Sequence, residues 1–79
     1  MNIDTDKVDE AVLALLYLTS FEYGRSGTRA WKGFDWNALD RLHKRGLIGN
    51  PRTKAKSVPI FEDGVNQSKE LFIKLFTKP

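Results

Sequence analysis

The sequence predicts a mainly α-helical domain with one small β-hairpin, in the order helix, helix, hairpin, helix. Three observations predict this class. Residues 34–48 contain a helix with a marked start and end, residues 47–61 read as two short strands around a turn, and both ends of the chain carry apolar residues at helical spacing. The 79 residues fit a single domain spanning 1–79. This order is that of a winged helix-turn-helix domain, with three helices and a two-stranded wing.

The middle helix is predicted over about residues 36–45. Asp35 suits the N-cap, because its carboxylate can accept a hydrogen bond from a free backbone N–H of the first turn. Gly46 can adopt a positive φ after the last turn, and Leu47 can then fold back on the helix in a Schellman ending. The apolar face of this helix comprises Trp36, Leu39 and Leu42.

The first helix is predicted over about residues 5–20, with acidic residues in its first turn. Its apolar residues extend round much of the helix, which is more than the single stripe that a surface helix needs. We therefore expect a homodimer with this helix in the interface. The alternative is that the C-terminal helix covers the extra apolar face within one chain. The expected interface residues are Val12, Leu13, Leu16 and Tyr17.

Residues 21–34 are predicted to be a loop or a short turn, because several glycines interrupt them. Thr28 could cap one short helical turn. A regular helix-turn-helix needs a full helix before its recognition helix, and this segment leaves little room for one. We interpret Trp31 and Trp36 as core anchors in preference to a base-stacking platform, since each can bury a large area.

The wing hairpin is predicted over residues 47–61. Gly49, Asn50 and Pro51 are typical turn residues. Pro59 lacks a backbone N–H, so its strand should lie at an edge or have one open side. A last helix is predicted over about residues 62–77.

Charge is unevenly distributed along the chain. The net charge is +3, with −4 in residues 1–24, +7 in residues 25–56 and 0 in residues 57–79. A positive middle third attracts polyanions, although it could also be a solvated surface that keeps the protein soluble. The candidate nucleic-acid-binding residues are Asn37, Arg41, Lys44, Arg45, Arg52, Lys54 and Lys56.

Little in the sequence indicates catalysis, so we expect no enzyme, no catalytic residue, no cofactor, no metal and no small-molecule substrate. The chain has no cysteine and a single histidine, His43, which we interpret as structural. The acidic residues of segment 4–10 fit a helix start better than a metal cluster. The longest apolar run, residues 11–18, is too short to cross a membrane, and the N-terminus lacks the basic start of a signal peptide. We therefore expect a cytoplasmic protein.

The segment Leu39–Ile48, followed by Val58–Gly64, resembles the "L-x-x-L-x-x-x-G-L-I … V-x-L-T-x-x-G" pattern of winged-helix regulators of the MarR and PadR types. This resemblance covers residues 34–76 and implies a winged-helix fold. Phe61 stands where the pattern has a capping Thr. The whole chain resembles a family of small bacterial proteins of unknown function, and that resemblance implies no activity.

Two functions follow as hypotheses. The first is nucleic-acid binding in transcriptional regulation, with double-stranded DNA as the partner. Asn37 and Arg41 are then the candidates for base edges, because their side chains can pair bidentately with adenine and guanine. The alternative is a non-catalytic protein-interaction or dimerisation module that has lost DNA reading.

Overall fold

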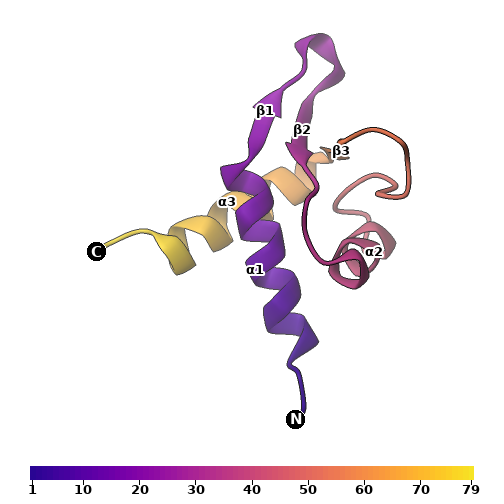
Figure 1. Ribbon diagram of the computed structural model, residues 1–79. Helices are drawn as coiled ribbons and strands as arrows, with labels where there is room; N and C mark the ends of the chain where they lie inside the picture. Colours follow the sequence, from indigo (N-terminus) through magenta and orange to yellow (C-terminus); the bar gives the residue numbers. More distant parts are fainter.

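The computed structural model describes residues 1–79 apart from the side chain of Ser26. Over the described residues, the chain forms three α-helices and a three-stranded antiparallel sheet. Helix α1 stands between α2 and the C-terminal half of α3, with the sheet at the C-terminal end of α1 (Figure 1). The helices are α1 (Thr5–Leu18), α2 (Trp36–Lys44) and α3 (Glu62–Phe76), and the strands are β1 (Ser20–Glu22), β2 (Thr28–Trp31) and β3 (Ser57–Ile60).

The three predicted helices are confirmed, with ends within two residues of those expected. The local signals at α2 also act as predicted. The Asp35 carboxylate accepts a hydrogen bond from the Ala38 N–H at 3.0 Å. At the other end, Gly46 has a φ of 75°, its N–H donates to the His43 carbonyl, and the Leu47 N–H donates to the Leu42 carbonyl. These two bonds are those of a Schellman ending.

The prediction of a loop or short turn over residues 21–34 is wrong where β1 and β2 form, although the segment between these strands is a turn. Strands β1 and β2 form an antiparallel hairpin in which Phe21 faces Arg29. The Tyr23 N–H donates to the Gly27 carbonyl at 2.8 Å, and Gly27 has a φ of 90°. The glycine therefore makes the turn of a hairpin, since it can adopt this backbone conformation without a steric cost. Thr28 begins β2 and caps no helical turn.

The prediction of a separate two-stranded wing over residues 47–61 is also wrong. Strand β3 pairs with β2, so the sheet has the order β1-β2-β3, and the first half of the expected wing contributes only the isolated bridge between Ile48 and Ile60. The edge position expected for Pro59 is confirmed. Its carbonyl accepts from the Gly49 N–H at 2.8 Å, on the side of β3 away from β2. The N–H that proline lacks would point to that same outer side.

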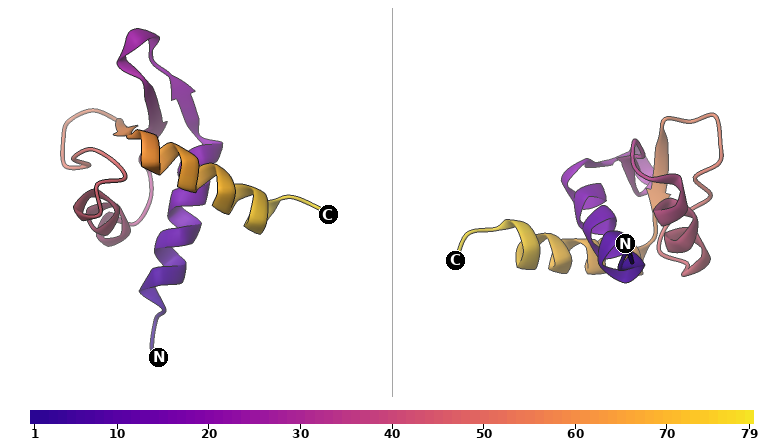
Figure 2. Two further views of the ribbon diagram at one scale, coloured as in Figure 1. Left: turned by 180° about the vertical axis from the view of Figure 1, so that it is seen from behind. Right: turned by 60° about the horizontal axis from the view of Figure 1, so that its bottom comes forward.

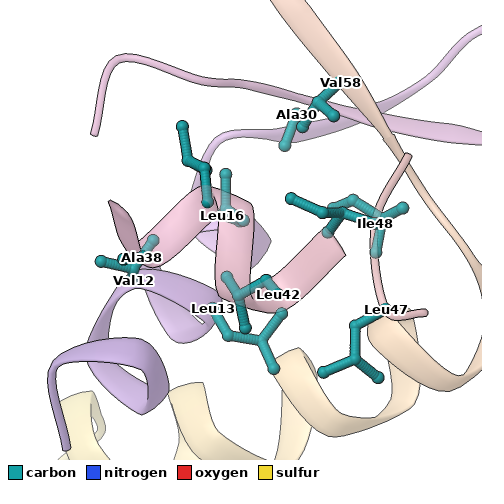
Figure 3. Packing of buried hydrophobic residues seen from close by; sticks show 11 residues of the cluster. Val12, Leu13, Leu16, Ala30, Ala38, Leu42, Leu47, Ile48 and Val58 are labelled. Atoms are coloured by element: carbon teal, nitrogen blue, oxygen red, sulfur yellow. The ribbon is translucent and has the colours of Figure 1, made fainter. Parts of the chain in front are cut away.

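The core lies where α1, α2 and the inner face of the sheet meet (Figure 3). Helix α1 packs mainly against α3 and α2. Helix α3 crosses α1, and its C-terminal half extends to the side of α1 opposite α2 in every view (Figure 2). The buried cluster comprises Val12, Leu13, Leu16, Ala30, Ala38, Leu39, Leu42, Leu47, Ile48, Val58 and Ile60.

This packing corrects the expected dimer interface. Val12, Leu13 and Leu16 are buried within the core of the single chain, so a second chain has no access to them. Tyr17 is half-buried and its ring lies 5.4 Å from that of Phe72 in α3. Helix α3 thus covers the extra apolar face of α1, which is the alternative that the sequence left open.

Candidate nucleic-acid interface

The basic residues predicted on α2 line a groove between the three helices. The groove has a volume of about 790 Å³, and Arg41, Lys44 and Arg45 share it with Lys74 of α3. It contains as many carboxylates as cations, so a polyanion gains little from entering it. The carboxylates are those of Asp6, Asp9, Glu10 and Glu70.

Arg41 is committed to an ion pair within the chain. Its Nε and Nη2 atoms donate to the two oxygens of Asp9, each at 2.7 Å, and Asp9 is only 4% exposed. The hydrogen bond to Asp9 raises the pKa of the Arg41 guanidinium. Removing Arg41 from this pair would leave a buried carboxylate without a partner, which is unfavourable. The expectation that Arg41 reads base edges therefore conflicts with the structure.

Arg52 also has a partner inside the chain. Its Nη2 donates to Asp40 Oδ2 at 2.6 Å and its Nε to Asp40 Oδ1 at 3.2 Å. This hydrogen-bonded guanidinium lowers the pKa of the Asp40 carboxyl. The pair ties the loop of residues 49–56 to the outer side of α2. A helix partly covered in this way is poorly placed to enter a DNA groove.

The same loop is anchored by Lys32, whose importance the sequence did not indicate. Its ammonium is buried and donates to the Pro51 carbonyl at 2.6 Å and to the Thr53 carbonyl at 2.9 Å. Two cations lie over the Trp36 ring, Lys32 Nζ at 5.8 Å and Arg52 Cζ at 5.3 Å from its centroid. Both distances are in the range of cation–π contacts.

Lys54 and Lys56 are exposed on this loop. Within the part of the chain that the structure describes, neither has a carboxylate at ion-pair distance. Lys56 directly precedes Ser57, which is the cross-strand partner of Trp31. The Lys56 carbonyl accepts a hydrogen bond from the Lys32 N–H. These two lysines therefore remain available to an anionic ligand, next to the edge of the sheet.

The outer face of the sheet carries aromatic side chains. Trp31 is 54% exposed, and its ring lies 5.1 Å from that of Phe21 on β1. Trp36 is 47% exposed at the start of α2. The interpretation of both tryptophans as core anchors is wrong. Alanine, leucine, isoleucine and valine fill the small core instead.

Arg29 lies on the same outer face, beside the aromatic pair. Its Nε donates to Ser57 Oγ at 2.8 Å and its Nη2 to the Ser57 carbonyl at 2.9 Å. Sequence reasoning missed this face, although a signal was present. The segment 28–31 contains Thr28 and Trp31, residue types that are enriched in strands.

Asn37 and His43 are the remaining residues of α2 that bear on function. Asn37 is exposed in the first turn of α2. His43 is exposed, and its Nδ1 lies 3.1 Å from the Ile48 carbonyl. Among the described residues, no cluster of His, Cys, Asp and Glu side chains is suited to hold a metal ion. Over the same residues, no helix has the length and apolar character needed to cross a membrane.

Comparison with known proteins places these features in a family. Residues 4–78 match the family model described as "Domain of unknown function (DUF6429)". A relative from Sinorhizobium fredii (strain NBRC 101917 / NGR234), described as "Uncharacterized protein y4hR", is 53% identical over 78 residues. The match covers 99% of this chain and 100% of the relative. No solved structure matches the chain.

Proposed function

We propose a nucleic-acid-binding role for this chain, which belongs to the DUF6429 family of domains of unknown function. One observation carries the proposal. Half-exposed aromatic rings, Trp31 and Trp36, occur together with cations on the sheet and on the loop of residues 49–56. Aromatic rings among cations form the kind of surface that contacts both the bases and the phosphates of a nucleic acid.

The proposed surface differs from the one expected on α2. Arg41 and Arg52 are held by Asp9 and Asp40, which leaves Lys54 and Lys56 as the loop cations for phosphates. Contacts of this kind are electrostatic and independent of sequence, so they position a nucleic acid without reading it. The proposed role includes transcriptional regulation by a winged-helix-like domain. A winged-helix domain has a recognition helix followed by a wing. The same order occurs here in α2, the bridge at Ile48, the loop of residues 49–56 and β3.

The proposed role is binding rather than catalysis, in the cytoplasm. The lack of cysteine supports the cytoplasmic location, because it suits a reducing compartment. The single histidine supports a role without catalysis, because its Nδ1 lies 3.1 Å from a backbone carbonyl. A general base needs a reacting group within hydrogen-bond reach.

The test is the binding of fluorescent oligonucleotides, single-stranded and duplex, between about 50 and 200 mM salt. We expect affinity to fall with salt, and the variant Lys54→Ala/Lys56→Ala to reduce the salt slope by roughly one unit per lost phosphate contact. The matched control is Lys69→Ala/Lys78→Ala, which removes two exposed lysines from α3 and the C-terminus. The proposal would be contradicted if neither the single-stranded nor the duplex oligonucleotide bound at the lowest salt. An equal effect of the control would also contradict it.

A second candidate function is a protein-interaction or dimerisation module, favoured by the C-terminal half of α3. This half extends beyond α1 (Figure 2) and carries Ile73, Leu75 and Phe76 at 51%, 44% and 48% exposure. Exposed apolar patches on a small protein commonly mark interaction sites. We propose that a homodimer forms through this half of α3, in place of the interface expected on α1.

A further inference from the structure

We propose that the preferred ligand is a single-stranded nucleic acid, whose bases stack on the outer face of the sheet at Trp31 and Phe21. This inference rests on the proposed nucleic-acid-binding function and names the class of ligand.

The register of the sheet places these side chains on one face. In β2, Ala30 is buried and belongs to the core, so its neighbours Arg29 and Trp31 point to the opposite side. Phe21 is the cross-strand partner of Arg29 and lies on that side as well. The two aromatic rings are 5.1 Å apart and inclined by 36°. They form an apolar platform between neighbouring strands, on the side of the sheet away from the core.

The exposure of Trp31 makes the platform available to a ligand. Its side chain keeps 54% of its surface in contact with solvent, although a tryptophan is among the side chains that gain most from burial. A flat, apolar ligand can cover this ring without any rearrangement of the core. Every nucleic-acid base has such a flat face, and stacking on an aromatic ring contributes about 1–3 kcal/mol per base.

Arg29 gives the platform a fixed positive charge. Its Nε and Nη2 atoms are held by Ser57, which restrains the guanidinium beside the rings and leaves Nη1 to donate to a ligand. Lys56 comes one residue before Ser57, and Lys54 two residues earlier on the same loop. A strand of nucleic acid with bases on the rings would thus have cations for its phosphates on and beside the β3 edge. This combination favours a polyanion with aromatic bases over an apolar peptide.

The same structure disfavours a duplex. Base faces are hidden inside a duplex, so an aromatic platform gains nothing from it. The helix that would enter a major groove is α2, and the bonds from Arg52 to Asp40 hold the loop against its outer side.

The test compares a fluorescent thymidine oligonucleotide of about 12 nucleotides, a length within the range of known single-strand sites, with a duplex of equal length. We expect the wild-type chain to bind the single strand more tightly. Trp31→Ala should weaken single-strand binding by about 5- to 150-fold, which is the loss of one stacked base, and should leave duplex binding within about threefold. Trp31→Phe keeps a flat ring and should restore most of the affinity.

Phe76→Ala is the matched control, because it removes a ring of similar exposure from the C-terminal half of α3, outside the proposed nucleic-acid surface. It should change single-strand binding much less than Trp31→Ala does. Circular dichroism of each variant checks that the fold is intact. If salt-dependent binding persists while Trp31→Ala leaves single-strand affinity unchanged, the platform is wrong and the proposed function stands. The same conclusion follows if the duplex binds as tightly as the single strand. If neither oligonucleotide binds, the proposed function and the platform both fail.

Discussion

Arg52, which the sequence predicted to bind nucleic acid, pairs instead with Asp40 of the same chain. Two hydrogen bonds join the side chains, and they tie the loop of residues 49–56 to α2. The pair lowers the pKa of Asp40 and raises that of Arg52. Arg52 lies over Trp36 as well, so a single side chain neutralises an acid and covers a ring.

This pairing predicts the titration of Asp40. We expect NMR to show its carboxyl titrating below the ordinary pKa of 3.8, because ionisation is favoured by the adjacent guanidinium. In Arg52→Gln the Asp40 pKa should rise toward that ordinary value. Titration of Asp40 at its ordinary pKa in the wild-type chain would show that the pair is absent in solution.

The same shift sets the sign of a pH dependence. The pKa of Asp40 is lower in the folded chain than in the unfolded one, so the pair stabilises the fold above the unfolded pKa. That stabilisation is lost as the pH falls through the folded pKa. The difference in stability between the wild-type chain and Arg52→Gln should therefore be small at neutral pH, as for exposed pairs generally, and should vanish in acid.

Residue-level signals were predictable where they are local. The cap at Asp35 and the positive φ of Gly46 depend on neighbours within a few positions, so the sequence contains all the information needed. The partner of Arg41 was not predictable, because Asp9 lies 32 residues away and the pair depends on how α1 packs against α2.

At the scale of elements, α3 is positioned by a close contact at its first turn. Gly64 is buried there, and a β-carbon at this position would overlap the Leu47 carbonyl oxygen and lie 2.9 Å from Ile60 Cγ2. The Phe61 N–H donates to that same carbonyl at 3.0 Å. Phe61 offers no side-chain hydrogen bond at the N-cap, as its departure from the capping Thr predicted. Contacts with Leu47 and Ile60 therefore position the start of α3, which has no side-chain cap.

Gly64→Ala should destabilise the fold by about 1–3 kcal/mol, because the added methyl group has no space and the backbone has to shift. Thermal unfolding should show a decrease of roughly 4–8 °C per kcal/mol for a domain of this size. Gly33→Ala is the matched control, since a β-carbon at that position has no heavy atom within 4 Å. Equal melting temperatures for Gly64→Ala and the wild-type chain would contradict the close contact.

The hairpin of β1 and β2 is the element that the sequence prediction missed. Its strands are three and four residues long, and glycines separate them. Glycine interrupts helices and also makes hairpin turns, so its presence alone does not distinguish the two. The β-propensity of Thr28 and Trp31 favours a strand, but over four residues this is a weak signal.

At the scale of the whole molecule, α1 is covered on two sides, by α2 and by α3, while the extension of α3 leaves apolar side chains exposed. The helix periodicity predicted that α1 needed more cover than one surface stripe. It could not show whether the cover came from the same chain, because a periodic pattern does not specify its partner. In the second half of α3, Ile73 and Phe76 are exposed, and the sequence again does not specify what covers them.

A dimer formed through this half of α3 predicts a mass that rises with concentration toward twice that of the monomer. Leu75→Glu should keep the chain monomeric, because a charge in an apolar interface has no partner. Analytical ultracentrifugation at tens of micromolar measures this. Asn66→Glu introduces the same residue at an exposed position in the first half of α3 and should leave the dimer intact. A wild-type chain that stays monomeric would remove the dimer and leave the nucleic-acid surface unaffected.

The most direct test of the proposed binding surface is an NMR titration of the labelled chain with a single-stranded thymidine oligonucleotide. We expect the largest shifts at the Trp31 indole, at the Arg29 side chain and in the amides of residues 54–57, with little change along α3. Shifts confined to α3 and the groove beside it, or no shifts at all at low salt, would contradict the claim that the sheet and its basic loop bind nucleic acid.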